Sequence, residues 1–115
     1  MTEECIFCQI VQGESPARIV YQDDEVTAFH TNAPRMPVHL LIVPNRHISS
    51  VNELEEADAT LIGRLSVVAA RLAAENGIAE SGYRLVVNTG PDAGQSVSHL
   101  HLHLIGGGPM PVFFS

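Results

Sequence analysis

The chain has 115 residues, of which 45% are hydrophobic, as expected for one compact domain, and we predict a single domain over residues 1–115. Its formal net charge is −7 and all six of its cationic side chains are arginines. No basic surface that could neutralise a polynucleotide backbone is expected, so we expect no nucleic-acid partner. A chain this short buries a modest share of its surface, which makes stabilisation by a partner subunit or a metal a reasonable expectation.

The N-terminal segment is acidic and lacks the basic residues and apolar run of a signal peptide. No stretch of about 18 apolar residues appears, so no membrane span is expected either. We therefore expect a cytoplasmic protein. In that reducing compartment Cys5 and Cys8 are expected to be thiols or metal ligands rather than a disulfide.

The first elements follow from hydrophobic runs and turn residues. A short helix is expected over residues 5–11, which are mostly apolar. Strands over 18–21 and 25–30 flank Asp23 and Asp24, a pattern typical of a hairpin. A third strand, bracketed by prolines over residues 38–43, is apolar throughout and too short for a helix, which indicates a buried strand.

One long helix is predicted in the middle of the chain. Asn52 is expected to cap a helix, with Glu55 three positions later completing a capping-box pair. The helix itself is expected over residues 60–76, where apolar residues recur at helical spacing and Gly77 follows at the position that favours a left-handed residue. This apolar stripe, which we interpret as core packing, consists of Leu61, Leu65, Val68 and Leu72.

Two more strands are expected over residues 84–88 and 99–105, joined by a loop rich in glycine, serine and proline. Strands, then a helix, then further strands favour the α+β class with an antiparallel sheet of about five strands.

Histidine and leucine alternate from His99 to Leu104. On a strand, His99, His101 and His103 would share one face at intervals of roughly 6.6 Å, with the leucines facing the core. The histidines could simply form the polar face of an exposed edge strand. We favour a catalytic role, because imidazole can act as a nucleophile, a general acid or base, or a metal ligand.

The residues before this run suit a phosphate. Gly94, Gln95, Ser96 and Val97 offer a flexible backbone, N–H donors and a hydroxyl, as an oxyanion cradle requires. A nucleophilic imidazole must be held in one tautomer, and the middle residue of the run has neighbours on both sides that can orient it. We therefore assign nucleophilic attack to His101.

The histidine run with its preceding Gly94-Gln95-Ser96 resembles the signature of the histidine triad (HIT) superfamily, Hint branch. Segments similar to that branch cover nearly the whole chain: 6–7, 20–30, 37–44, 47–49, 84–88 and 94–97. The resemblance implies a HIT-like fold with one long helix and a short N-terminal helix, and a homodimer. It also implies hydrolysis of purine nucleoside 5′-phosphoramidates or related adenylates through a nucleotidyl-histidine intermediate, with no cofactor required for catalysis.

The resemblance also implies roles for individual residues. His101 corresponds to the nucleophile, His103 lies near the phosphate and His39 supports a proton relay. Ser96 is placed among the catalytic residues and, with Asn88, among those that contact ribose or phosphate. The expected apolar walls around the base are Phe7, Ile10 and Phe29. His30 receives no role.

The chain departs from the family pattern after residue 30, where an aspartate usually accepts hydrogen bonds from the ribose hydroxyls. Thr31 and Asn32 stand there instead, as weaker candidate ribose contacts. This departure favours a second hypothesis, a nucleotide-binding regulatory protein with little turnover. A third is a dinucleoside polyphosphate hydrolase or nucleotidyl transferase of the same superfamily.

Cys5 and Cys8 form a C-x-x-C pair, which needs two more ligands to close a tetrahedral zinc site. Some bacterial histidine triad proteins complete such a site with histidines at the positions of His47 and His99. The resemblance therefore implies a structural zinc. The alternative is two small buried thiols without a function.

Overall fold

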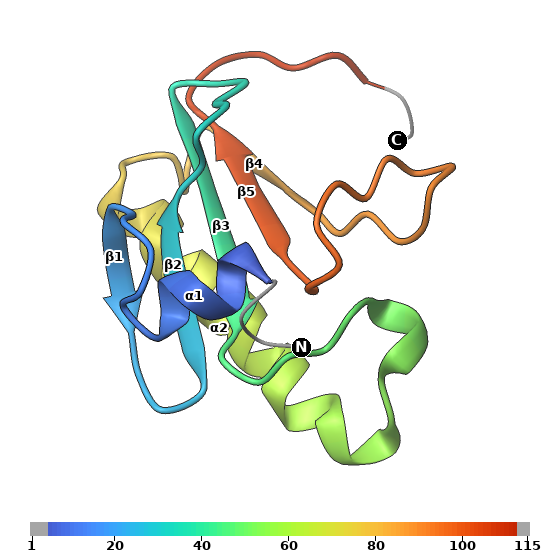
Figure 1. Cartoon of the computed structure of the whole chain (residues 1–115). Helices are drawn as coiled ribbons and strands as arrows, with labels where there is room; N and C mark the ends of the chain where they lie inside the picture. Colours follow the sequence, from blue (N-terminus) through green and yellow to red (C-terminus); the bar gives the residue numbers. More distant parts are fainter. Residues whose placement is uncertain (1–4, 113–115) are drawn as a thin grey trace.

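The computed structural model describes residues 5–112. Its centre is an antiparallel sheet of five strands in the order β1-β2-β3-β5-β4 (Figure 1). The strands are β1 (Ile19–Gln22), β2 (Val26–His30), β3 (Val38–Pro44), β4 (Tyr83–Val86) and β5 (Leu102–Gly106). The helices are the short α1 (Ile6–Val11) and the long α2 (Ala59–Glu75), which two 3-10 turns precede, η2 (Val51–Glu53) and η3 (Glu56–Asp58). The predicted α+β class, with an antiparallel sheet of five strands, one long helix and a short N-terminal helix, is confirmed.

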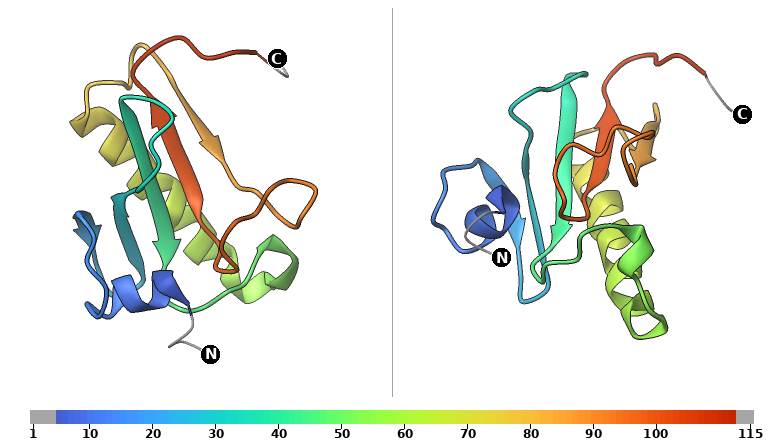
Figure 2. Two further views of the ribbon diagram at one scale, coloured as in Figure 1. Left: turned by 45° about the horizontal axis from the view of Figure 1, so that its top comes forward. Right: turned by 45° about the vertical axis from the view of Figure 1, so that its right-hand side comes forward.

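The two helices cover opposite faces of the sheet (Figure 2). Alternate residues of β3 divide between them: Leu40 and Ile42 pack in the core beneath α2, whereas Leu41 and Val43 pack with α1. Because a strand with both faces covered must be apolar throughout, β3 reads as a continuous hydrophobic run. The face under α1 is the one that carries the candidate site described below.

The hairpin and the long helix agree with the sequence. Asp23 lies in the turn between β1 and β2, where Oδ1 accepts hydrogen bonds of 2.8 Å from the backbone N–H groups of Glu25 and Val26. Helix α2 buries the predicted stripe at Leu65, Val68 and Leu72, with Leu61 partly buried. It ends at Glu75, and Gly77 adopts the expected left-handed conformation with φ 72°.

The helix starts at Ala59, one residue before the predicted position, but the predicted cap is wrong. Asn52 lies within η2, where its own N–H donates to the side chain of Ser50. The capping box forms between Glu55 and Asp58 instead, immediately before α2. Asp58 also receives a hydrogen bond from Arg46, so this carboxylate ties the loop before η2 to the start of the helix.

The strand predicted over residues 99–105 begins only at Leu102, and β4 likewise ends two residues before the predicted 88. The segment 99–101 is held outside the ladder because the N–H of Leu100 donates to the carbonyl of Ile48 at 2.7 Å. Only His103 of the three histidines therefore lies within the strand, although the rings of His99 and His101 both contact Phe7 of α1 and the rings of His101 and His103 are adjacent. The leucines do face the core, and β5 lies between β3 and β4, so the hypothesis of an exposed edge strand is wrong.

Within the described residues, no helix is long and apolar enough to cross a membrane.

Candidate active site

His101 lies just before β5, with only 4% of its surface exposed. Its Nδ1 is 2.8 Å from the backbone carbonyl oxygen of His99, which can only accept a hydrogen bond. Nδ1 therefore carries the proton, and in the neutral ring Nε2 keeps a free lone pair. The edge of this ring also meets the ring of Phe7, with centroids 5.1 Å apart. His101, which follows the buried Leu100, is thus held in the tautomer whose Nε2 lone pair could attack a substrate.

A second pair of histidines continues from this ring. The centroids of His101 and His103 are 5.0 Å apart, and Nδ1 of His103 lies 2.9 Å from Nε2 of His39. The backbone N–H of Arg35 donates to Nδ1 of His39 at 3.0 Å, which leaves the His39 proton on Nε2. His39 therefore donates to His103, whose own proton must lie on Nε2.

Both rings are neutral at pH 7. Burial and the neighbouring His101 and His39 lower the pKa of His103 to about 4. Burial, followed by the charge of Arg35, lowers the pKa of His39 as well. The pair therefore presents one N–H donor, Nε2 of His103, beside the lone pair of His101.

Two cavities meet at these histidines. The first, of about 420 Å³, contains most of the residues predicted to bind a nucleotide: Phe7, Ile10, Phe29, Thr31, Asn32, Ser96, Val97, His101 and His103. Phe7 and Phe29 form an edge-to-face pair with centroids 5.4 Å apart. Sequence reasoning missed Leu41 and the segment 15–17, which also line this cavity, and left His30 unassigned although it lies there too.

The second cavity, of about 370 Å³, is more polar. It shares Thr31, Ser96 and His103 with the first, and adds Asn88, Gly94 and His39 from the predicted set. It also contains Arg35, which sequence reasoning missed. The available signal was its position four residues before His39, in a proline-bracketed loop.

Of the residues predicted to bind a nucleotide, Gln95 alone lines neither cavity. Its side-chain amide donates to the carbonyls of Ser49 at 2.7 Å and Val97 at 3.0 Å, and accepts from the N–H of Gly90 at 3.0 Å. Gln95 therefore holds the loop before the histidines in shape.

The four predicted metal ligands lie together. The start of α1, which carries Cys5 and Cys8, lies beside the segment that leads into β5 (Figure 1). One ligand atom from each of Cys5, Cys8, His47 and His99 lies within 4.8 Å of the other three. Nε2 of His99 donates to the carbonyl of Pro44 at 2.8 Å, so that Nδ1 presents a lone pair 3.2 Å from the sulfur of Cys5. A ligating histidine usually makes this kind of hydrogen bond with its other nitrogen.

The chemistry of the cluster suits a soft divalent cation. Burial, followed by the hydrogen bond with Cys5 and the charge of Cys5, raises the pKa of the Cys8 thiol to about 11. Both sulfurs would therefore be thiolates at neutral pH only beside a positive charge. Ligand atoms in a tetrahedral zinc site lie roughly 3.3–3.8 Å apart, and the sulfur–nitrogen distances here are 3.2, 3.3 and 3.5 Å. The four residues therefore fit a structural zinc, which they would hold without an open position.

A family model for the HIT domain matches residues 12–110. The chain belongs to the HIT family. This HIT protein is 49% identical over 110 residues to "Purine nucleoside phosphoramidase" of Escherichia coli (strain K12), an alignment covering 96% of this chain and 92% of that relative.

Solved structures confirm the predicted HIT-like fold. "HIT family hydrolase from Clostridium thermocellum" superposes with a TM-score of 0.94 at 44% identity, covering 97% of this chain and 98% of that one. A zinc-bound histidine triad family protein from Mycobacterium smegmatis superposes with a TM-score of 0.79 at 28% identity, covering 91% of this chain and 76% of that one.

Proposed function

We propose that this HIT protein hydrolyses purine nucleoside 5′-phosphoramidates or related adenylates through a nucleotidyl-histidine intermediate. The observation that carries the proposal is the hydrogen bond from Nδ1 of His101 to the carbonyl of His99, which keeps Nε2 free for attack. The adjoining cavity has apolar walls, as a purine requires, and a polar end at the histidines. The Escherichia coli relative is named as an enzyme of this class.

In the first step, the lone pair on Nε2 of His101 forms a bond to the α-phosphorus. The bond between phosphorus and the leaving nitrogen breaks, and the amine leaves with that electron pair and a proton from water at the cavity mouth, where Ser96 is exposed. The His101 ring becomes cationic as the bond forms. The His99 carbonyl stabilises that charge at Nδ1, and Nε2–H of His103 donates to a phosphoryl oxygen.

In the second step, water attacks the phosphorus from the side that the amine vacated. The bond from phosphorus to Nε2 breaks, its electron pair returns to His101, and the proton of the attacking water passes to solvent. The products are a nucleoside monophosphate and the free enzyme.

The bound nucleotide would use the rest of the first cavity. The base would lie against Phe7, Ile10 and Phe29, and the ribose hydroxyls would contact Thr31 or Asn32. Asn88, Ser96 and the backbone at Gly94 would contact the phosphate from the second cavity. Neutral donors at the phosphate suit a protein of net charge −7, because they bind an anion without a cationic cluster.

The deciding experiment compares the turnover of a fluorogenic adenosine phosphoramidate with that of a dinucleoside tetraphosphate. We expect a higher kcat/KM for the phosphoramidate, and His101→Ala should abolish turnover while AMP still binds. Faster cleavage of the tetraphosphate would favour a dinucleoside polyphosphate hydrolase or nucleotidyl transferase. Binding of AMP with turnover of neither substrate would favour a regulatory protein, which the Thr31-Asn32 departure already suggests.

We also propose that Cys5, Cys8, His47 and His99 hold a structural zinc. The support is the closeness of the four ligand atoms and the zinc-bound relative from Mycobacterium smegmatis. When bound, the ion would neutralise the two thiolates and join the start of α1 to the segment before β5. The catalytic steps above use no metal.

A homodimer is the third part of the proposal, with the contact at β4 and α2. β4 is an edge strand in which Leu85 pairs with Leu104, so both point to the α2 face, yet Leu85 is 39% exposed. Val67 of α2 is 55% exposed. The other edge strand, β1, carries a register irregularity, a feature that discourages pairing between sheet edges.

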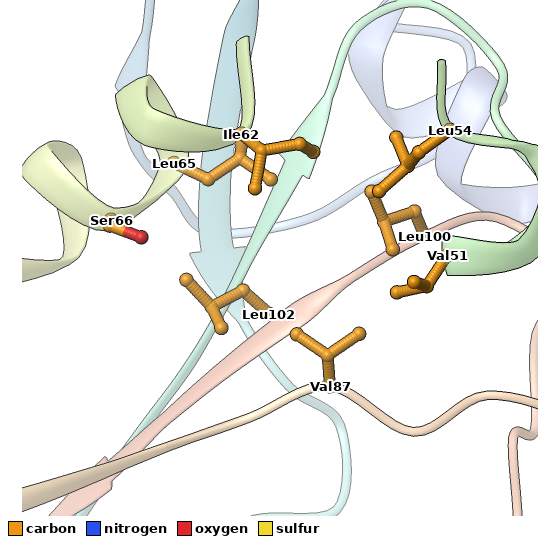
Figure 3. Close-up of a pocket in the computed structure, with 8 residues that line it drawn as sticks. All are labelled: Val51, Leu54, Ile62, Leu65, Ser66, Val87, Leu100 and Leu102. Carbon is orange, nitrogen blue, oxygen red and sulfur yellow. The ribbon is translucent and has the colours of Figure 1, made fainter. Parts of the chain in front are cut away.

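Beside this edge lies a small apolar cavity, between α2, η2 and the end of β4 (Figure 3). It is lined by Val51, Leu54, Ile62, Leu65, Ser66, Val87, Leu100 and Leu102. Val51 and Val87 also expose 43% and 39% of their surfaces. An uncovered apolar surface that extends an edge strand suits a second copy of the chain.

A further inference from the structure

The two cavities differ in whether His101, the proposed nucleophile, lines them. His101 lines the first cavity and is absent from the lining of the second, whereas Ser96 and His103 line both. In-line displacement places the leaving group opposite the attacking nitrogen, across the phosphorus. A phosphate seated between His101 and the shared residues therefore directs its leaving group into the second cavity.

The second cavity has one charged side chain, Arg35, and no carboxylate among its lining residues. In the described part of the chain, ion pairs engage Arg46 with Asp58 and Arg64 with Asp23, and none engages Arg35. Although the chain has thirteen acidic residues, none of them lines this cavity. The guanidinium of Arg35 is therefore available to pair with a negatively charged ligand.

The position of Arg35 is set by its backbone. Its N–H donates to Nδ1 of His39 at 3.0 Å, and prolines at 34 and 37 restrict the loop around it. Its charge acts on the His39 ring, whose pKa it lowers, so the guanidinium lies within electrostatic reach of the histidine pair. The side chain is exposed and can follow a ligand that enters the cavity.

We propose that Arg35 is a specificity-determining residue, which favours substrates whose amine leaving group carries a carboxylate, as an amino acid linked to phosphorus through its α-nitrogen does. This inference rests on the proposed phosphoramidase function and adds the class of leaving group to it. A guanidinium binds a carboxylate through paired N–H donors, and the amide of the same amino acid cannot form that ion pair. Because Arg35 is exposed, the preference is modest, about fivefold in kcat/KM at low salt, and it decreases as salt screens the charge.

The test uses two nearly isosteric substrates, the adenosine 5′-phosphoramidates of glycine and of glycinamide, both linked through nitrogen. The measured quantity is the ratio of their kcat/KM values in the 115-residue chain. Arg35→Gln should reduce the ratio about fivefold, mainly by slowing turnover of the glycine conjugate, and Arg35→Lys should retain part of it. The matched control is Arg71→Gln, which removes the same charge from α2, where Arg71 lies over the ring of Tyr21.

The outcomes separate this inference from the function on which it rests. If wild type and Arg35→Gln cleave both substrates with the same ratio, the role of Arg35 is wrong and the phosphoramidase function stands. If neither substrate is cleaved, the proposed function is wrong. Binding of both intact conjugates to the His101→Ala protein, with and without Arg35→Gln, then still tests the carboxylate preference: an unchanged ratio of Kd values overturns it.

Discussion

The backbone carbonyl of His99 accepts the Nδ1 proton of His101, while the ring of the same His99 turns its Nδ1 toward the sulfurs of Cys5 and Cys8. One residue therefore joins the proposed zinc ligands to the proposed nucleophile, His101. Phe7, which lies between the two cysteines in sequence, reinforces the connection, because its ring meets the edges of both histidine rings. Whether the Cys5–Cys8–His47–His99 cluster holds a metal should therefore affect how firmly the His101 ring is oriented.

Cys5→Ser should lower the zinc content of the purified protein and its thermal stability. Metal that binds only the folded state stabilises it, and removal of one thiolate weakens that binding. Metal analysis should give about one zinc per chain in wild type and markedly less in the variant, with a melting temperature several degrees lower. His30→Gln, which changes a histidine outside the cluster, is the control. Full zinc in Cys5→Ser would eliminate the proposed ligand set.

His103 should make the protein less stable in acid. Its pKa is about 4 when folded and 6.5 when unfolded, so between these values the unfolded chain binds more protons. The contribution of the neutral ring is complete above pH 6.5 and is lost as the pH falls toward 4. In urea titrations at pH 7, 5.5 and 4.5, His103→Gln should show a smaller loss of unfolding free energy than wild type. Parallel pH profiles would contradict the buried, neutral state of this ring.

Asp23 should stabilise the β1–β2 hairpin. Its carboxylate accepts hydrogen bonds from two backbone N–H groups, from Tyr21 and from Arg64, and together these lower its pKa to about 2 against the cost of burial. Asp23→Asn should cost about 1–2 kcal/mol of unfolding free energy at neutral pH.

Asp24→Asn is the control for that prediction, because Asp24 is the exposed neighbour in the same turn. The difference in unfolding free energy between the two variants should shrink as the pH falls from 3.8 toward 2, where the Asp23 carboxylate becomes protonated. Equal stability of both variants at pH 7 would show that the network contributes little.

Leu85→Asp should convert a dimer to a monomer if the chain associates through β4. A carboxylate placed in an apolar contact loses its hydration without gaining a partner. Sedimentation velocity at micromolar concentration should show the mass of two chains for wild type and of one for the variant. Val20→Asp, an equally apolar and exposed site on the opposite edge strand, should remain dimeric. A wild-type monomer would exclude this contact.

Local sequence patterns determined much of this protein. The apolar run of β3 predicted a strand that is buried on both faces. Helical periodicity predicted the stripe at Leu65, Val68 and Leu72, and Gly77 predicted the left-handed residue that follows the helix. The C-x-x-C pair likewise indicated a metal site, and the histidine run indicated a catalytic site. The grouping of His47 and His99 with the cysteines, and the assignment of attack to His101, came from the resemblance and the run itself.

Tertiary structure decided what those residues can do. The tautomer of His101 depends on a carbonyl that faces its ring only because Leu100 pairs with Ile48 and pulls residues 99–101 out of the strand. The low pKa of His103 comes from burial and from the neighbouring His101 and His39. The position of its proton depends on the His39 ring and the backbone N–H of Arg35, which lie more than sixty positions away in the sequence. The position of Arg35 in a second cavity likewise follows from the packing of β3 against β5. Spacing along a chain predicts which face of an element a side chain occupies, whereas proton positions and cavity linings depend on groups brought together from distant parts of the sequence.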